Sequence, residues 1–318
     1  MTTDMPLVTV LLNNYNYGPF LAQAIDSVLA QPYSNLEVVV VDDGSTDDSR
    51  EITSSYGDRL IPVFKENGGQ ASAFNAGFAV SHGEWVLLLD SDDLFLPRKV
   101  DALVSYAKTF PLAGVIGHDY DYCDKWGDAI HFPSPKVGLT RLVDDTSNAR
   151  RGKFSACLPP TSALALRRDI ATQIFPMPED ITICADNFIR TLVLALTPVL
   201  LISECLSMQR LHSKNSFTTL IRTQESTLAE CLAAARVAYR MKERFPFLDK
   251  IAWKAYGAVA YRLMASRAKN AKEVRKTVRL KYRLLDGSLP SFYYVGGGFV
   301  ATLLRDFIDA RSIRQGSL

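Results

Sequence analysis

The sequence predicts an α/β fold with a mixed, mainly parallel sheet flanked by helices. Three apolar runs, at residues 7–12, 36–41 and 85–89, carry this prediction. A strand with one exposed face alternates polar and apolar residues, whereas these runs are nearly continuous and are typical of strands buried on both faces. Segments with helical spacing separate the runs, and alternating strands and helices are the pattern of a parallel sheet.

The elements between these strands have recognisable boundaries. A helix is expected after the Gly-Pro pair at 18–19, because apolar residues then recur every three or four positions, at Leu21, Ile25, Val28 and Leu29. Ser45 is expected to cap a second helix, with Asp48 three residues on in a capping-box arrangement. Residues 60–64 predict a short strand, and a glycine turn at 67–70 leads into a third helix.

Polar residues follow each of the three apolar runs. The first run is followed by residues 13–16, the second by 42–43, and the third by Asp90, Asp92 and Asp93. Ligands of α/β sheets bind beyond the carboxyl ends of the strands. Carboxylates this close repel each other, and a divalent cation that prefers oxygen ligands, Mg²⁺ or Mn²⁺, relieves the repulsion. The cluster therefore indicates either a metal site for a nucleotide diphosphate or a solvated acidic turn.

The composition is that of an ordinary globular protein with one large domain and an extension. The 318 residues are 47% hydrophobic and 22% charged, which excludes a disordered or fibrous chain. The five cysteines are odd in number and lack CxxC spacing, so neither a disulfide framework nor a zinc site is expected, and a reducing cytoplasm is favoured. No secretory signal or membrane span is expected, since the start lacks a basic and apolar leader and the run at 191–203 is short.

The charge is unevenly distributed along the chain. Residues 240–318 hold 17 Lys and Arg against 6 Asp and Glu, a balance of +11, and the remainder holds 19 against 28, a balance of −9. A basic region of this kind meets nucleic acid, an anionic membrane surface or an acidic substrate, or is a solvated helix face. Sparse aromatic interleaving and the acidic remainder argue against nucleic acid.

Five segments form one ordered pattern, at residues 8–16, 24–31, 37–47, 67–77 and 83–93. In order and spacing this pattern resembles the family 2 glycosyltransferases with the GT-A fold, and the resemblance extends to Ser216. Members of that family move a sugar from a nucleotide diphosphate sugar to an acceptor and invert the anomeric carbon. The resemblance implies a Rossmann-like nucleotide-binding catalytic domain over residues 1–218, with 219–318 as a helical, basic carboxyl-terminal extension.

The resemblance also implies which residues bind the nucleotide sugar. Asn13 and Tyr15 would border the base, and Asp43 would accept a hydrogen bond from it. Uridine diphosphate is the expected carrier, with thymidine and guanosine diphosphates open. The further residues expected in this site are Asn67, Gly69, Asp90 and Ser91.

The same resemblance implies a metal site for Mn²⁺ or Mg²⁺. Asp92 would ligate the metal, Asp90 would bind the metal or the ribose, and His212 in the closing segment would complete the site. Asp93 would support the loop. At Phe74 the chain departs from the family, where many members have a basic residue, so a cation from this helix is not expected near the phosphates.

Asp186 is expected to be the catalytic base. The family usually has Glu-Asp at this place, whereas this chain has Ala185 before Asp186, so the helper carboxylate is missing. An acceptor hydroxyl loses its proton as the new bond forms, and a positioned carboxylate accepts it in the transition state. The alternative role of Asp186 is to cap a helix, and one side chain can do both.

The segments expected to select the acceptor are those that resemble the family least. Residues 118–122 would line an acceptor pocket or simply continue a polar strand, and 131–151 predict a loop or insertion. In the extension, 222–241 and 248–285 predict helices, and 292–304 is apolar but too short to span a bilayer. The extension would lie on a membrane surface or pack as ordinary helices.

The sequence therefore predicts a metal-dependent inverting glycosyltransferase. Its acceptor would be a glycan or a lipid-linked saccharide, its role cell-surface polysaccharide synthesis, and its location the cytoplasm or the inner face of the plasma membrane. A nucleotidyltransferase and a catalytically silent sugar- or nucleotide-binding protein are the alternatives. The first lacks its usual glycine-rich basic loop here, and the presence of Asp90, Asp92 and Asp186 argues against the second.

Overall fold

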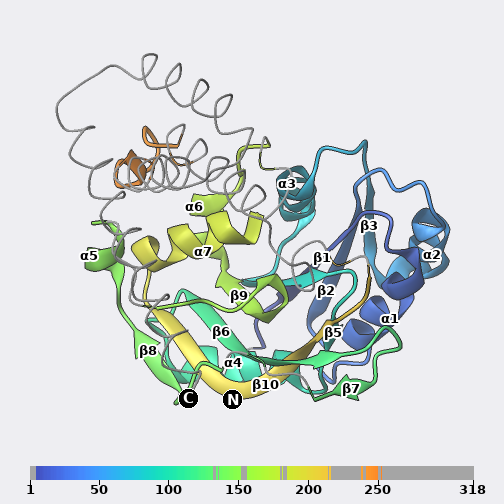
Figure 1. Cartoon of the computed structure of the whole chain (residues 1–318), viewed down its shortest axis with the longest axis horizontal. Helices are drawn as coiled ribbons and strands as arrows, with labels where there is room; N and C mark the ends of the chain where they lie inside the picture. Colours follow the sequence, from blue (N-terminus) through green and yellow to red (C-terminus); the bar gives the residue numbers. More distant parts are fainter. Residues whose placement is uncertain are drawn as a thin grey trace, which may run out of the picture. The chain divides into compact units, whose positions relative to one another are not determined.

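Two compact units make up the chain in a computed structural model (Figure 1). The structure describes residues 5–131, 134, 136–151, 156–179, 181, 185–213, 215, 238, 241–249 and 252. One unit comprises Met1–Ala149 and Phe154–Leu220, and the other comprises Arg150–Lys153 and Ile221–Leu318. The domain boundary after residue 218 stays a sequence-based prediction.

The first unit contains a mixed sheet, which has ten strands among the described residues. Its order is β3-β2-β1-β4-β9-β6-β10-β5, with β7 paired to β6 and β8 paired to β10. The strands are β1 (Val8–Asn14), β2 (Leu36–Asp42), β3 (Ile61–Phe64), β4 (Trp85–Asp90), β5 (Leu94–Phe95), β6 (Val115–Cys123), β7 (Ala129–Ile130), β8 (Arg141–Val143), β9 (Leu164–Arg167) and β10 (Val199–Arg210).

The half of the sheet that contains β1 is parallel, as predicted. β1 pairs in parallel with both β2 and β4, and β2 pairs in parallel with β3. The three predicted apolar runs form β1, β2 and β4, and almost all of their residues are buried. In the other half, β9 runs antiparallel between β4 and β6, while β6 and β10 are parallel to each other.

Helices cover both faces of this sheet (Figure 1). They are α1 (Gly18–Leu29), α2 (Ser49–Ser55), α3 (Gln70–Val80), α4 (Lys99–Thr109), α5 (Thr146–Ala149), α6 (Arg168–Ile174) and α7 (Ala185–Leu196), with short 3₁₀ turns at Gly57–Arg59 and Thr161–Ala163. Apolar residues of α1 and α4 form one core cluster with alternate residues of the strands. α3 packs on the other face, where Gly77 lies against Leu11 and Val41. Phe78 of α3 stacks at 4.6 Å on Phe175, which follows α6, so these two helices share that face.

The expected capping box at Ser45 is wrong. Helix α2 begins at Ser49, and no side chain caps it. The Ser45 hydroxyl instead accepts hydrogen bonds from Asn14 Nδ2 (3.1 Å) and the Asn16 backbone N–H (2.9 Å). Ser45 is therefore used to hold the loops after β1 and β2 together, a contact between segments far apart in sequence.

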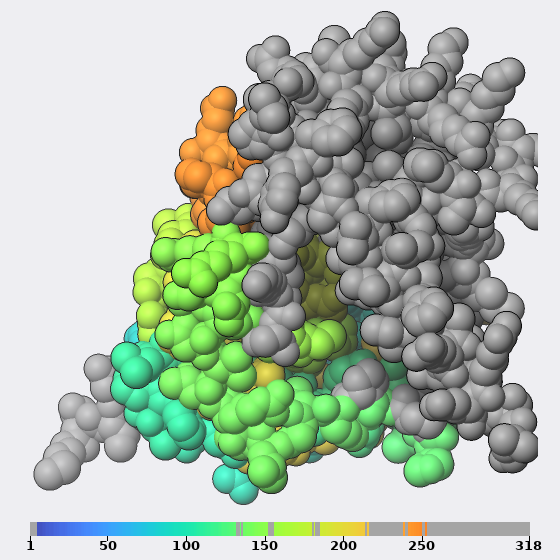
Figure 2. Space-filling model, turned by 60° about the vertical axis from the view of Figure 1, so that its left-hand side comes forward, coloured from blue at the N-terminus to red at the C-terminus, as the bar shows by residue number. Residues whose placement is uncertain are grey.

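The region after residue 117 has more regular structure than the sequence predicted. β6 continues through Cys123, so residues 118–122 are the strand continuation that was one of the two alternatives. The expected loop at 131–151 contains β8 and α5. This segment is on the surface of the first unit, in green in Figure 2. Among the described residues, none of the helices combines the length and apolar character needed to cross a bilayer.

Few residues of the second unit are described. Within 241–249, Phe245 and Leu248 are buried, and the Phe245 N–H donates to the Met241 carbonyl (2.7 Å). The predicted helices at 222–241 and 248–285 and the apolar segment at 292–304 lie almost entirely outside the described residues.

Candidate active site

The polar residues at the ends of β1, β2 and β4 meet at one edge of the sheet. Because β1 lies between β2 and β4, Asn13 is in register with Asp90 and Asn14 with Asp42. Asn14 Nδ2 donates to Asp42 Oδ1 (3.1 Å), whereas its buried Oδ1 has no hydrogen-bond partner among the described residues. Asn13 is 9% exposed, yet its carboxamide nitrogen and oxygen have no hydrogen-bond partner among the described residues. Buried polar groups are normally hydrogen-bonded, so Asn13 fits a site that a polar ligand completes.

Asp43 ties the glycine turn before α3 to the end of β2. Its carboxylate accepts hydrogen bonds from Lys65 Nζ (2.6 Å) and from the backbone N–H groups of Gly68 (3.0 Å) and Gly69 (2.8 Å). Gly69 precedes α3 with a φ of 83°, a conformation that favours glycine. Asn67 is exposed at the start of the turn. The turn predicted from the sequence therefore lies at the amino end of α3, where the Asp43 carboxylate accepts its backbone N–H groups.

Tyr15 is 47% exposed in the loop that follows β1. It follows the unpaired Asn13 by two residues, and the neighbouring Asn16 takes a positive φ of 58°. Asn16 Oδ1 accepts the backbone N–H of Thr46 (2.8 Å), which ties this loop to the one after β2. An exposed aromatic ring on a fixed loop is free to stack on a planar ligand.

The acidic loop after β4 concentrates negative charge in a buried place. Burial raises the pKa of Asp90 well above its ordinary value, and the charges of Asp93, Asp92 and Asp186 raise it further. Burial also raises the pKa of Asp93 to about 8, with Asp92 adding to the effect. Ser91, between them, is buried. Carboxylates held this close in a dry place favour a bound cation, because it removes their mutual repulsion.

Arg210 supports this loop, and the sequence analysis gave it no role. It is fully buried at the end of β10. Its Nε donates to the Asp92 carbonyl (2.7 Å), and its backbone N–H donates to Asp93 Oδ1 (3.0 Å). Nη1 and Nη2 reach Lys125 O (2.9 Å) and Gln23 Oε1 (2.8 Å). The contact between Asp93 and the Arg210 backbone is consistent with the expected role of Asp93 in supporting the loop. The guanidinium group of Arg210 joins the acidic loop to α1 and to the turn between β6 and β7.

His212 lies next to Asp92, as the resemblance implied. Its Nε2 is 3.1 Å from Asp92 Oδ2, and its ring stacks on Phe20 at a centroid distance of 4.4 Å. Asn215 is a second residue that the sequence analysis missed. Its Oδ1 accepts the His212 backbone N–H (2.6 Å), and its Nδ2 donates to Asp92 Oδ2 (3.3 Å). These contacts fix the imidazole against the acidic loop.

Asp186 lies in the first turn of α7 and belongs to the same charged cluster. It raises the pKa of Asp90, and its own carboxylate is 3.5 Å from the Arg190 guanidinium, one helical turn on. Gln70 bridges the two elements, since its Nε2 is 3.5 Å from Asp90 Oδ1 and its Oε1 accepts the backbone N–H of Ala185 (2.8 Å). The structure therefore brings the expected base to the acidic loop, through a residue whose role the sequence analysis did not identify.

The donor set suits a divalent cation that keeps open positions. Asp92 and His212 are adjacent, and Asp90 is a buried carboxylate whose pKa is raised first by burial and then by the surrounding negative charge. Within the described part of the chain, no three acidic, His or Cys side chains converge as a complete metal site. Mg²⁺ and Mn²⁺ sites commonly use one or two carboxylates, with water and substrate phosphates as the other ligands. The residues present therefore fit such an ion when a diphosphate completes its coordination.

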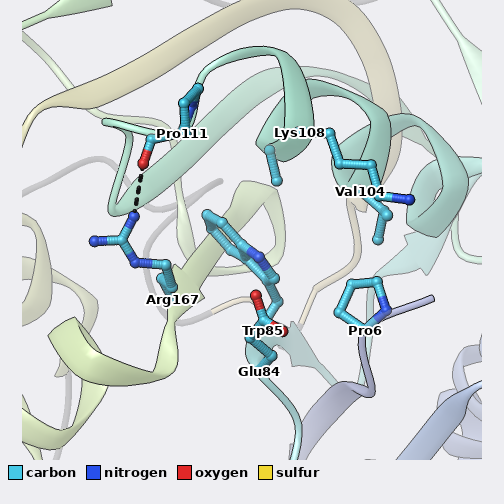
Figure 3. A pocket seen from close by; sticks show the side chains of 8 residues that line it. Pro6, Glu84, Trp85, Val104, Lys108, Pro111 and Arg167 are labelled. Carbon is cyan, nitrogen blue, oxygen red and sulfur yellow. Dashed lines mark hydrogen bonds between the residues drawn. The ribbon is translucent and has the colours of Figure 1, made fainter. Parts of the chain in front are cut away.

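A separate cavity of about 340 Å³ opens at the opposite edge of the sheet (Figure 3). It is lined by residues at the starts of β1 and β4 and at the end of α4, among them Pro6, Trp85 and Lys108. Arg167 also lines it and donates to the Pro111 carbonyl (3.0 Å). None of the residues expected in the site lines this cavity, so the acidic edge and not the cavity is the candidate active site.

Solved structures identify the fold. TarS of S. aureus, solved in complex with UDP, aligns with a TM-score of 0.55 and 18% identity over 87% of this chain and 91% of that chain. The mannosyltransferase PcManGT from Pyrobaculum calidifontis aligns with a TM-score of 0.51 and 17% identity over 96% of this chain and 88% of that chain. The fold is the GT-A-like fold of glycosyltransferases, as expected.

Sequence relatives identify the family. The profile described as Glycosyl transferase family 2 matches residues 9–175. An uncharacterised glycosyltransferase of Nostoc sp. is 38% identical over 218 residues, which are 66% of this chain and 66% of that protein. Glycosyltransferase GlyG of Streptococcus pneumoniae is 35% identical over 178 residues, or 53% of this chain and 59% of GlyG. The chain thus spans about two thirds or less of these relatives. It belongs to glycosyl transferase family 2.

Proposed function

We propose that the protein is a metal-dependent inverting glycosyltransferase that uses a nucleotide diphosphate sugar, with UDP as the favoured carrier. The acceptor is the hydroxyl of a glycan or a lipid-linked saccharide of the kind used for cell-surface polysaccharides. The observation that carries the proposal is the shared charged cluster of Asp90, Asp92 and Asp186, drawn from the end of β4 and the start of α7. A transferase needs a diphosphate site and a base side by side, and the electrostatic effect of Asp186 on Asp90 supports this assignment.

The residues of the cluster have separate roles in the reaction. Asp92, with Asp90 and His212, would hold Mn²⁺ or Mg²⁺, which supplies positive charge to the leaving diphosphate. Asp186 accepts the acceptor hydroxyl proton as the oxygen attacks the anomeric carbon from the face opposite the leaving group. A single displacement of this kind inverts the anomeric centre. Holding both reactants in line accounts for a large part of the expected rate enhancement.

The ends of β1 and β2 bind the nucleotide in this proposal. The unpaired carboxamide of Asn13 and the exposed ring of Tyr15 border the base, and Asp43 with Asn67, Gly69 and Ser91 completes the nucleotide-sugar site. Solved structures of similar fold support this choice of ligands. TarS was solved with UDP and with UDP-GlcNAc, and PcManGT with GDP-Man and Mn²⁺.

Donor hydrolysis tests the proposal without knowledge of the acceptor. Purified protein is incubated with a panel of UDP, GDP and TDP sugars, with Mn²⁺ or with EDTA, and released nucleoside diphosphate is measured. We expect slow, Mn²⁺-dependent release from one donor and loss of that release in Asp92→Ala. Asp58→Ala, an exposed carboxylate in the 3₁₀ turn at Gly57–Arg59, is the control and should behave as wild type.

The same assay separates the alternatives. Release of pyrophosphate from a nucleoside triphosphate would identify a nucleotidyltransferase instead. Donor binding by calorimetry with no release in the presence of candidate acceptors would identify a silent sugar-nucleotide-binding protein. The proposal fails if no donor binds when Mn²⁺ is present.

A further inference from the structure

We propose that Ser162 is a positioning residue for the metal site. Its hydroxyl fixes the shape of the acidic loop after β4 and thereby sets the affinity of that loop for the divalent cation. This inference rests on the proposed function, because it assumes that Asp92 binds a cation. It assigns a role to the short 3₁₀ turn at Thr161–Ala163, which contributes none of the residues expected in the site.

Ser162 lies beside the acidic loop because of the way β9 pairs with β4. The two strands are antiparallel, and their last pair places Leu87 opposite Ala165. If this register continues, Ser162 lies opposite Asp90. The chain forms the 3₁₀ turn there instead of a strand, and the Ser162 hydroxyl accepts the Asp90 backbone N–H (3.1 Å). A side chain therefore takes the place of a main-chain acceptor at the end of β4.

The same hydroxyl reaches the other end of the acidic loop. Residues 90–93 form a turn in which the Asp93 backbone N–H donates to the Asp90 carbonyl (3.0 Å). Burial raises the pKa of Asp93 to about 8, and a hydrogen bond that the Ser162 hydroxyl donates to this carboxylate opposes the effect. A hydroxyl has a donor as well as acceptor sites, so one group can accept from Asp90 and donate to Asp93. Ser162 therefore ties together both ends of the turn that carries Asp92.

A buried lysine holds Ser162 in place. Ser162 is 3% exposed, and its carbonyl accepts a hydrogen bond from Lys99 Nζ (2.7 Å). Lys99 is the first residue of α4 and is fully buried, with its Nζ 3.5 Å from the centre of the Phe95 ring. An aromatic face and a hydrogen bond both stabilise an ammonium group that has lost its water. The backbone of Ser162 is therefore fixed before a metal binds.

This support matters because the loop carries charges that repel each other. Without a cation, the carboxylates of Asp90, Asp92 and Asp93 favour an open arrangement of the turn. In Ser162→Ala the Asp90 N–H loses this acceptor and Asp93 loses a donor, so the turn relaxes and has to be formed again when the metal binds. Partners that orient metal ligands commonly change metal affinity about 10- to 100-fold when they are removed. The loss of the hydroxyl should therefore appear in metal affinity.

Titration with Mn²⁺, followed by electron paramagnetic resonance, tests the inference, because free and bound Mn²⁺ give different signals. Wild type, Ser162→Ala, Ser162→Thr and Ser81→Ala are titrated with UDP present, or with GDP or TDP if wild type binds one of these more tightly. Nucleotide without protein supplies the blank. Ser81 is the matched control, because it is a buried serine after α3 whose hydroxyl donates to the Phe78 carbonyl (2.9 Å) and accepts from Arg168 (3.0 Å). Thermal unfolding compares the stability of the variants.

In Ser162→Ala we expect the Mn²⁺ dissociation constant to rise about five- to fiftyfold. Donor hydrolysis should then need correspondingly more Mn²⁺, while its rate at saturating Mn²⁺ changes by less than about twofold. Ser162→Thr keeps the hydroxyl and should bind Mn²⁺ within about threefold of wild type. Ser81→Ala should lose about as much stability as Ser162→Ala and keep the Mn²⁺ affinity of wild type.

Three results would overturn the inference. Unchanged Mn²⁺ affinity in Ser162→Ala would mean that the hydroxyl does not shape the loop. An equal loss in Ser162→Ala and Ser81→Ala would mean that Mn²⁺ affinity follows stability alone. An equal loss in Ser162→Ala and Ser162→Thr would attribute the effect to packing at this position and not to the hydroxyl.

Failure of the proposed function gives a different result. If wild type binds no Mn²⁺ with any of the three nucleotides, the metal-dependent function fails, and the inference that rests on it fails with it. If wild type binds Mn²⁺ and Ser162→Ala binds it equally well, the inference alone fails.

Discussion

At the scale of single residues, Asp186 is the side chain on which the chemistry depends most directly. It stands in the first turn of α7, within the electrostatic reach of Asp90. We expect Asp186→Asn to slow metal-dependent donor hydrolysis about 100- to 10,000-fold, because the amide keeps the shape but cannot accept a proton. UDP affinity, measured by calorimetry, should change little.

A neighbouring helix provides the control for Asp186. Asp169 has the same place in the first turn of α6. Asp169→Asn should leave hydrolysis unchanged. If Asp186→Asn hydrolyses donor at the wild-type rate, its carboxylate serves only to begin α7, and the base has to be sought elsewhere.

Asp93 makes stability depend on pH in the absence of metal. Its pKa is about 8 in the folded protein against 3.8 for an ordinary Asp, because it is buried beside Asp92. As the pH rises, the unfolded chain therefore releases the Asp93 proton at a lower pH than the folded protein does. The contribution of Asp93 to the free energy of unfolding is full below about pH 4 and is lost as the pH rises to about 8, at up to about 1.4 kcal/mol per pH unit.

Asp93→Asn tests that pH dependence, since asparagine cannot ionise but keeps an oxygen for the Arg210 N–H. Urea unfolding is measured in EDTA at several values between about pH 5 and pH 8 for both proteins. We expect the difference in unfolding free energy between wild type and variant to shift in favour of the variant as the pH rises. Parallel pH profiles would mean that Asp93 is already ionised in the folded protein.

At the scale of elements, the approach of α3 to the sheet depends on Gly77. A Cβ on this residue would lie 2.1 Å from Leu11 Cδ1 and 2.8 Å from Val41 Cγ2. Gly77→Ala should therefore destabilise the protein by about 1–3 kcal/mol, although alanine favours helices, because the core has to shift to admit it. Ala79→Ser, on the exposed side of α3, should change stability by less than about 0.5 kcal/mol. Urea midpoints compare the two, and equal effects would mean that the helix can move freely.

The sequence predicted the short strand β3 and, most clearly, the strands that are buried on both faces. β1, β2 and β4 are buried on both faces, so continuous apolar runs identify them, and polar residues mark their ends. The antiparallel place of β9 between β4 and β6 has no comparable local signal. Strand order in that half depends on pairings between segments far apart in the chain, which periodicity does not record.

The residues of the candidate site also divide into those with a local sequence signal and those without one. Residues that stand on strand ends or match family motifs were predicted, and in the structure His212 contacts Asp92, whose charge acts on Asp90. Gln70, Arg210 and Asn215 were missed, since their roles depend on contacts with residues that lie far away in the sequence. Ser45 shows the opposite error, because a local capping pattern was outweighed by a contact with Asn14.

At the scale of the whole molecule, the charge of the chain is divided between its two ends. Residues 240–318 carry a balance of +11 and the remainder carries −9. A lipid-linked acceptor would lie at an anionic membrane surface, and each Lys or Arg near such a surface contributes about 1 kcal/mol of attraction. If the extension instead packs as ordinary helices, we expect no charge-dependent binding of the protein to lipid.

Vesicle binding by the full chain decides between these two roles. We expect sedimentation with vesicles that contain about 30% anionic lipid and little with neutral vesicles, because counter-charges on the lipid attract the basic extension. The binding should fall steeply at about 0.5 M NaCl, where screening shortens the range of the attraction to a few ångströms. A variant with several extension lysines changed to glutamine should lose vesicle binding and keep donor hydrolysis. Equal binding to neutral and anionic vesicles would mean that the contact is apolar and not electrostatic, and binding to neither would leave the extension as packed helices.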